Sequence, residues 1–226
     1  DTNNMKKLLT LALVFVIGAT CASAQTQKEI NKENRARDRY TEQQLNEKAP
    51  KSARKAAKKD LREGWTVAPG HLPLDKQYEM AYTMRLERDA EGFIYITGDG
   101  QSIGENYDAA KMQALELAKM NLAGQIETEI TAIVESTVAN KQLEANEAAS
   151  IVETIQASKN VISKRIGRVV PVVEVYRESR NKNKEVRVLL FYNRKTGMES
   201  AKQVIREELE KKGDKLHEKI EQVLGF

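Results

Sequence analysis

The sequence predicts an α+β fold in which long helices pack on one face of a small antiparallel sheet. A strand-like stretch, GFIYITGDG, begins at Gly92 and comes shortly before a long helical stretch. Two more strand-like stretches, RVVPVVEVYR and EVRVLLFYN, are joined by the polar segment ESRNKNK, which is typical of a β-hairpin. The expected order is therefore strand, helix, helix, strand, strand, helix. This order differs from the repeated strand–helix alternation of doubly wound nucleotide-binding folds.

The long helix is expected from Tyr107 to about Val138, because apolar residues recur along it at helical spacing. These residues are Ala110, Ala114, Ala118, Leu122, Ile126, Ile130 and Ile133. We expect the small alanines to bring the first half of the helix close to the sheet, while the larger side chains fill space further along. A second amphipathic helix is predicted to carry Ala148, Ile151, Ile155, Ile162 and Ile166.

The first residues have the pattern of a secretory signal. Two lysines follow Met5, a short apolar run comes next, and small residues lead up to Ala24. We expect the signal to start at Met5 and cleavage to follow Ala24, so that Gln25 begins the mature chain. The apolar run is shorter than the roughly 20 residues that cross a bilayer, and the mature chain has no predicted transmembrane segment.

Cys21 is the only cysteine of the chain. It would carry a lipid if the leader were that of a bacterial lipoprotein. Gly18 stands where such a leader has Leu, Val or Ile, so removal of Cys21 with the signal is favoured and lipidation stays open. A mature chain that starts at Gln25 then has neither a disulfide nor a thiol nucleophile.

The chain divides by composition. Basic residues outnumber acidic ones between Gln25 and Gly64, where large apolar residues are scarce, and this predicts a basic, largely flexible arm. A short helix over Ser52–Glu63 is the expected exception, with Ser52 as its cap. The predicted segments are a signal peptide (1–24), the arm and linker (25–75), the α+β domain (76–195) and a C-terminal amphipathic helix (196–226).

The glycine-rich segment GDGQSIG, residues 98–104, raises the question of nucleotide binding. Its glycine spacing is one residue longer than the dinucleotide fingerprint, and a second helix follows where that fingerprint needs a parallel strand. Asp99 and Asp108 would also repel a phosphate. We therefore expect a turn that leads into the long helix, capped by Asn106 or Asp108, and no bound cofactor.

Candidate catalytic and metal-binding residues are few. His71 lies in a proline-rich segment and His217 on a charged helix face, and neither is spaced to share a zinc ion with another His or Cys. No carboxylate is expected in an apolar setting. The sequence thus predicts a protein that is not an enzyme and holds no metal. Nucleic acid is not an expected partner either, because the basic arm has few aromatic residues and export is predicted.

The order of three segments also resembles that of a known family. A glycine-bearing strand enters a long alanine-rich helix, and the strand KEVRVLLFYN follows later. The stretch from Gly98 to Ser136 resembles the twenty-kilodalton bacterial envelope lipoprotein family, typified by a Helicobacter surface lipoprotein. The residues that carry the resemblance are Ala110, Ala114, Ala118, Asn121, Leu122, Ala123, Ile126, Val134 and Ser136. The resemblance implies an envelope-associated protein without known catalysis. The basic arm and the C-terminal helix are additional to the family pattern.

The C-terminal segment holds the candidate interaction residues, which are Leu209, Leu216, Ile220 and Val223. Such an apolar stripe must be buried, against either the chain's own domain or another chain. We expect an exported protein of the periplasm or outer-membrane periphery that acts through contact with an envelope protein or with a second copy. The basic arm is a candidate contact to an anionic surface. The alternative is a periplasmic protein that binds a small ligand or a cell-wall polymer between the helices and the sheet.

Overall fold

The computed structural model describes residues 31, 32, 35, 46–140, 143–179, 181–212, 216 and 220. The chain divides into two units after Lys48, and the fold belongs to the unit that starts at Ala49. This division lies earlier than the predicted boundary at residue 75. The predicted signal peptide and most of the predicted arm lie outside the described residues.

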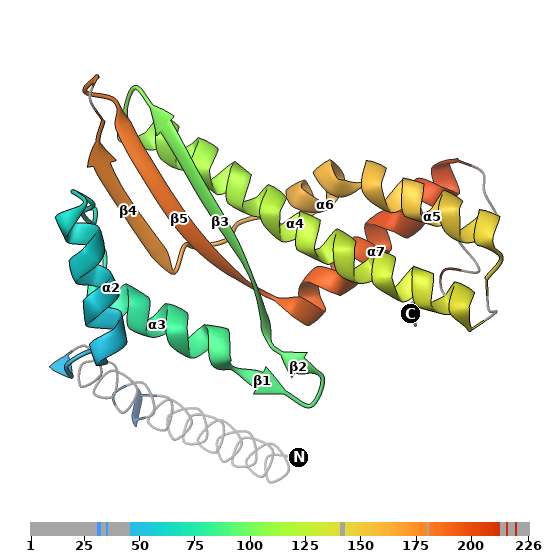
Figure 1. Cartoon of the computed structure of the whole chain (residues 1–226), viewed down its shortest axis with the longest axis horizontal. Coiled ribbons are helices and arrows are strands. Elements are labelled where there is room, and N and C mark those ends of the chain that lie inside the picture. Colours follow the sequence, from blue (N-terminus) through green and yellow to red (C-terminus); the bar gives the residue numbers. More distant parts are fainter. Residues whose placement is uncertain are drawn as a thin grey trace, which may run out of the picture. The chain divides into compact units, whose positions relative to one another are not determined.

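The unit that starts at Ala49 contains both helices and strands. In chain order they are α2 (Lys51–Arg62), α3 (Leu74–Leu86), β1 (Arg88–Asp89), β2 (Gly92–Phe93), β3 (Tyr95–Gly104), α4 (Tyr107–Ala139), α5 (Ala145–Ala157), α6 (Lys159–Arg165), β4 (Val173–Glu178), β5 (Lys184–Asn193) and α7 (Arg194–Lys211). Figure 1 shows the sheet with α4 along it and α5, α6 and α7 beyond. The predicted α+β class and the order from β3 to α7 are confirmed, with α2, α3 and the short β1–β2 pair added in front.

The main sheet is antiparallel with the strand order β3-β5-β4. β4 and β5 form the predicted hairpin, and β3 pairs with β5 along its whole length, from Tyr95 opposite Asn193 to Gly104 opposite Lys184. β4 starts only at Val173, shortly after Pro171, whose nitrogen has no hydrogen to donate to a strand ladder. The hairpin prediction is therefore right in topology, but β4 is shorter than predicted.

The predicted turn at residues 98–104 is wrong, because these residues belong to β3. Gly98 and Gly100 face α4, and a Cβ atom at these positions would lie 2.2 Å from the Ala118 carbonyl oxygen and 2.0 Å from the Ala114 carbonyl oxygen, respectively. The glycines thus permit close contact between strand and helix. The chain turns after Gly104, where the Asn106 side chain accepts a hydrogen bond of 2.9 Å from an α4 backbone N–H and confirms Asn106 as the cap.

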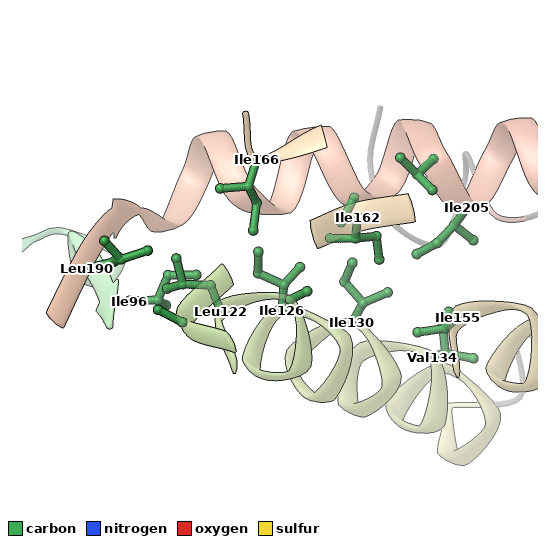
Figure 2. Close-up of a cluster of buried hydrophobic side chains, with 14 of the residues drawn as sticks. Ile96, Leu122, Ile126, Ile130, Val134, Ile155, Ile162, Ile166, Leu190 and Ile205 are labelled. Atoms are coloured by element: carbon green, nitrogen blue, oxygen red, sulfur yellow. The ribbon is translucent and has the colours of Figure 1, made fainter. Parts of the chain in front are cut away.

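α4 is the predicted long helix, and its side chains change in size along its length. The alanines of its first half are buried against the sheet, and the larger Leu122, Ile126 and Ile130 are buried further along. Figure 2 shows Ile126 and Ile130 pointing from α4 toward Ile162 and Ile166. One core cluster thus joins the sheet to the helices beyond it.

The predicted second amphipathic helix is divided in two at Ser158, between α5 and α6. The Ser158 hydroxyl donates to the Thr154 carbonyl at 2.7 Å, and both side chains are buried. The isoleucines predicted to share one face nevertheless all lie in the core cluster with α4. The apolar pattern was therefore a better guide to burial than to where the helix ends.

Amide side chains of α4 also cover part of the outer edge of β3. Asn121 donates to the Asp99 carbonyl at 2.6 Å, and Gln125 donates to the Thr97 carbonyl at 2.5 Å. These carbonyls lie on the edge of the sheet away from β5. Such covering reduces the tendency of an open edge to pair with another chain.

The other face of the sheet is covered as well, by α2 and α3, whereas helices on one face only were predicted. A second cluster of buried apolar residues forms there and consists of Ala57, Trp65, Leu74, Ala81, Val173, Val175 and Phe191. The helix predicted at Ser52–Glu63 is confirmed as α2, but it follows Pro50 and is not capped by the Ser52 side chain. The stretch after residue 75 forms most of α3.

A buried polar network fastens α2 and α3 to β5. Asp60 of α2 accepts hydrogen bonds from the Tyr78 hydroxyl of α3 and from the Arg187 guanidinium of β5. Burial and the bond to Asp60 raise the pKa of Tyr78, so its hydroxyl stays a neutral donor. Two guanidinium groups contact the Trp65 ring, with Arg177 at 4.3 Å and Arg187 at 4.6 Å from its ring centre.

Replacing Asp60 with Ala is expected to lower the free energy of unfolding by about 2–4 kcal/mol, because Tyr78 and Arg187 lose their shared acceptor. Trp65 is the only tryptophan, so its fluorescence reports on this region during urea unfolding. Asp99→Ala, at an exposed position, serves as the control and should stay within about 0.5 kcal/mol of the parent. Equal shifts for the two variants would contradict the network's role.

Candidate interaction groove

The predicted interaction stripe lies mostly in the chain's own core. Leu209 and Ile220 are fully buried in the cluster with α4, and Leu216 is partly buried against the same cluster. Val223 lies outside the described residues. These three residues are therefore unsuited to hold a partner. Of the two alternatives, burial against the chain's own domain or against another chain, the structure shows the first. A partner surface has to be sought elsewhere.

A groove with a volume of about 360 Å³ lies between the first half of α4 and residues 168–171, which lead into β4. Its apolar lining consists of Met112, Leu115, Val169, Val170 and Pro171. Its charged and polar lining consists of His71, Lys111, Glu116, Lys119, Arg168 and Glu174. The groove therefore combines apolar and charged side chains in its lining.

Two large apolar side chains face the solvent at this groove. Met112 is 65% exposed and Val170 is 72% exposed. Met112 lies outside the stripe of alanines by which α4 contacts the sheet, so its helix position turns it outward. Neighbouring exposed apolar side chains on a folded domain are typical of a surface that binds a partner.

Glu174 forms a buried polar centre at one end of the groove. Its carboxylate accepts from the Tyr107 hydroxyl, lies 2.7 Å from the Lys111 ammonium nitrogen, and lies 3.6 Å from His71 Nε2. Its backbone N–H donates to the Gln77 side chain at 2.8 Å. The carboxylate thus connects α4, β4 and the segment before α3.

Glu174 is a buried carboxylate, but Tyr107 and Lys111 surround it with polar and charged groups, so it does not contradict the prediction that no carboxylate stands in an apolar setting. The run VVPVVEVY was the available signal of its burial. Its partners could not be inferred in the same way, because Tyr107 and Lys111 are far away in the sequence. His71, which was not predicted to have a partner of this kind, also lies beside Glu174.

The lining of the groove carries more positive than negative charge. Lys111 is balanced by Glu174, and Lys119 lies 3.2 Å from Glu116. Arg168 is exposed, and no ion pair of Arg168 is found within the described part of the chain. An acidic group on a ligand therefore has a cation available next to the apolar side chains of the groove.

A second cleft of about 650 Å³ lies near the β1–β2 pair and the middle of α4. Phe93 and Tyr95 supply aromatic rings to its lining. Phe93 is exposed, and the Arg88 guanidinium lies 4.1 Å from its ring centre. Arg194 donates to Glu129 at 2.7 Å within the same lining. Residues of α3, β2, β3 and α4 line this cleft.

The residues that the structure describes contain no group of three or more His, Cys, Asp or Glu side chains placed to hold a metal ion. None of their helices is both long and apolar enough to cross a membrane. Comparison of the chain with family models, curated proteins and solved structures finds no match.

Alkaline pH is expected to weaken the Tyr107–Glu174 contact. Burial, followed by the hydrogen bond to Glu174, raises the pKa of Tyr107 above its ordinary value of 10.0. A raised folded-state pKa means that this stabilisation is complete below about pH 10 and is lost as the pH rises toward the folded-state pKa. Urea midpoints measured from neutral pH to above pH 10 should fall more steeply for the parent than for Tyr107→Phe. Parallel curves would show that the tyrosine is not the responsible group.

Proposed function

We propose that this chain is an exported, non-catalytic protein of the bacterial cell envelope that acts by binding another protein in the groove beside α4. The observation that carries the proposal is the pair of solvent-facing apolar side chains, Met112 and Val170, in a groove that charged side chains also line. Protein-binding surfaces also combine apolar and polar side chains. Methionine also adapts its shape to different partner side chains.

The chemistry of the groove favours a polypeptide segment with an apolar side chain next to an acidic one. The apolar side chain would pack between Met112 and Val170, and the carboxylate would approach Arg168. Close packing of α4 on β3 and the buried Glu174 contacts hold the groove walls in place before binding. A preformed site loses less conformational freedom when the partner arrives.

Location in the envelope rests on the sequence. The pattern from Met5 to Ala24 supports export, and the resemblance of residues 98–136 to an envelope lipoprotein family supports the same compartment. The mature chain is proposed to start at Gln25 without lipid. Mass spectrometry of the N-terminus of the exported protein tests this directly, and a lipid on Cys21 would contradict it.

Charge introduced into the groove is expected to abolish partner binding without unfolding the domain. Val170→Glu and Met112→Glu both place a carboxylate at an exposed apolar position, so co-purification of the envelope partner should fall at least tenfold. Leu86→Glu is the matched control, since Leu86 is also 72% exposed but lies outside this groove. Equal losses for Val170→Glu and Leu86→Glu, or no loss for either, would contradict the proposal.

The second candidate function is binding of a small ligand or a cell-wall polymer in the cleft near β2. The exposed Phe93 ring favours it, because sugar rings and other flat ligands pack on aromatic faces. Calorimetric titration with soluble cell-wall fragments should give a heat of binding that is lost in Phe93→Ala. Heat that persists in Phe93→Ala would place such a ligand elsewhere.

A further inference from the structure

α2 presents nearly all of its charge on one side. Six basic residues are exposed along this helix, and they are Lys51, Arg54, Lys55, Lys58, Lys59 and Arg62. The residues that α2 buries are Ala53, Ala57 and Asp60. Since an α-helix has about 3.6 residues per turn, the six cations all point away from the buried side. The buried side of α2 therefore consists of two alanines and the hydrogen-bonded Asp60, and its outer side is basic.

The positive charge of this outer side is poorly balanced. Asp60 is the one acidic residue within α2, and it is turned inward to Arg187 and Tyr78. Among the described residues, the ion pair found for the six cations is that of Lys59 with Glu63, at 3.9 Å. An exposed pair at this distance contributes little. The surface thus retains a strong positive potential.

A cleft and an exposed leucine adjoin these cations. The cleft has a volume of about 630 Å³ between α2 and Tyr82 of α3, and its lining includes Lys55, Lys59 and Arg62. Leu61, at the border of the basic side, is 56% exposed. A helix with a basic side and an exposed apolar side chain at its border has the features by which surface helices bind anionic lipid headgroups.

We infer that the basic side of α2 is a docking surface for an anionic phospholipid bilayer. Charge complementarity identifies the occupant, since a row of lysine-rich cations matches a surface of dispersed negative charges better than a single ligand. The Asp60 network holds α2 on the sheet, so the cations belong to the folded domain and not to a free tail. This inference is independent of the proposed protein-binding groove.

The two surfaces can be occupied together. α2 contacts the face of the sheet opposite α4, and the groove lies along α4 (Figure 1). A domain held on a membrane through α2 therefore leaves the groove accessible to a partner. Peripheral attachment of this kind needs no helix that crosses the bilayer.

Vesicle co-sedimentation of the protein in its exported form tests the inference. The protein should bind vesicles that contain phosphatidylglycerol and should bind pure phosphatidylcholine vesicles much more weakly. Binding should fall steeply between about 0.1 M and about 1 M salt, where the screening length shortens from about 10 Å to about 3 Å. Because each cation near an anionic surface strengthens binding by roughly fivefold, Lys55→Gln/Lys58→Gln/Lys59→Gln should weaken it by about a hundredfold.

A matched control distinguishes the effect of the α2 surface from the effect of a lower net charge. Lys164→Gln/Lys195→Gln/Lys211→Gln removes the same charge from exposed lysines outside α2 and should bind within about threefold of the parent. Trp65 fluorescence checks that α2 stays docked in both triple variants. Equal loss in the two variants, equal binding to both kinds of vesicle, or tighter binding to a short nucleic-acid duplex than to anionic vesicles would overturn the inference. None of these outcomes bears on the groove variants, whose readout is partner co-purification.

Discussion

Gly100→Val is expected to lower the free energy of unfolding by more than about 3 kcal/mol or to prevent folding altogether. A Cβ atom at this position would lie 2.0 Å from the Ala114 carbonyl oxygen and 2.7 Å from the Ala118 backbone nitrogen. Both atoms belong to the α4 backbone, so no side-chain movement relieves the overlap and α4 must move away from β3. Urea unfolding followed by circular dichroism measures the effect.

Gly124→Ala is the control, because it also adds a Cβ atom to a glycine, in this case within α4 itself. There the nearest atom is the Lys159 ammonium nitrogen at 3.0 Å, at the end of a flexible side chain. Alanine is favoured over glycine inside a helix by about 0.5–1 kcal/mol, so this variant should be as stable as the parent or more stable. A Gly100→Val protein with an unchanged midpoint would show that β3 and α4 are not in close contact.

Ile130→Ala is expected to cost about 2–5 kcal/mol. Ile130 is fully buried in the core cluster that joins α4 to α5, α6 and α7, so its removal leaves a cavity that these helices cannot easily fill. Ile103→Ala makes the same chemical change at an exposed strand position and should cost less than about 1 kcal/mol. Equal urea midpoint shifts in the two variants would mean that this side of α4 faces water.

The sequence predicted α4 and the hairpin well, because both depend on local patterns. The apolar period of α4 continues for its whole length, and the hairpin strands follow each other directly. Contacts between distant segments were harder to predict. Asp60 and Arg187 are 127 residues apart, and the sequence around Asp60 indicates only a charged helix. The cover that α2 provides for the second sheet face was therefore missed.

The glycines of β3 show a different difficulty. A glycine that allows a turn and a glycine that allows a helix to approach look alike in a sequence. At Gly98 and Gly100 the partner alanines of α4 decide between the two roles, and the decisive fact is a distance in space. The candidate site is similar, since Met112 and Val170 form one groove only once α4 and the segment before β4 lie side by side.

Photocrosslinking in intact cells tests the central claim most directly. A photoreactive amino acid in place of Val170 or Met112 should form an adduct with one and the same envelope protein. The same amino acid in place of Leu86, which is as exposed as Val170, should not form that adduct. Adducts of equal yield from all three positions, or from none of them, would contradict a protein-binding role for the groove.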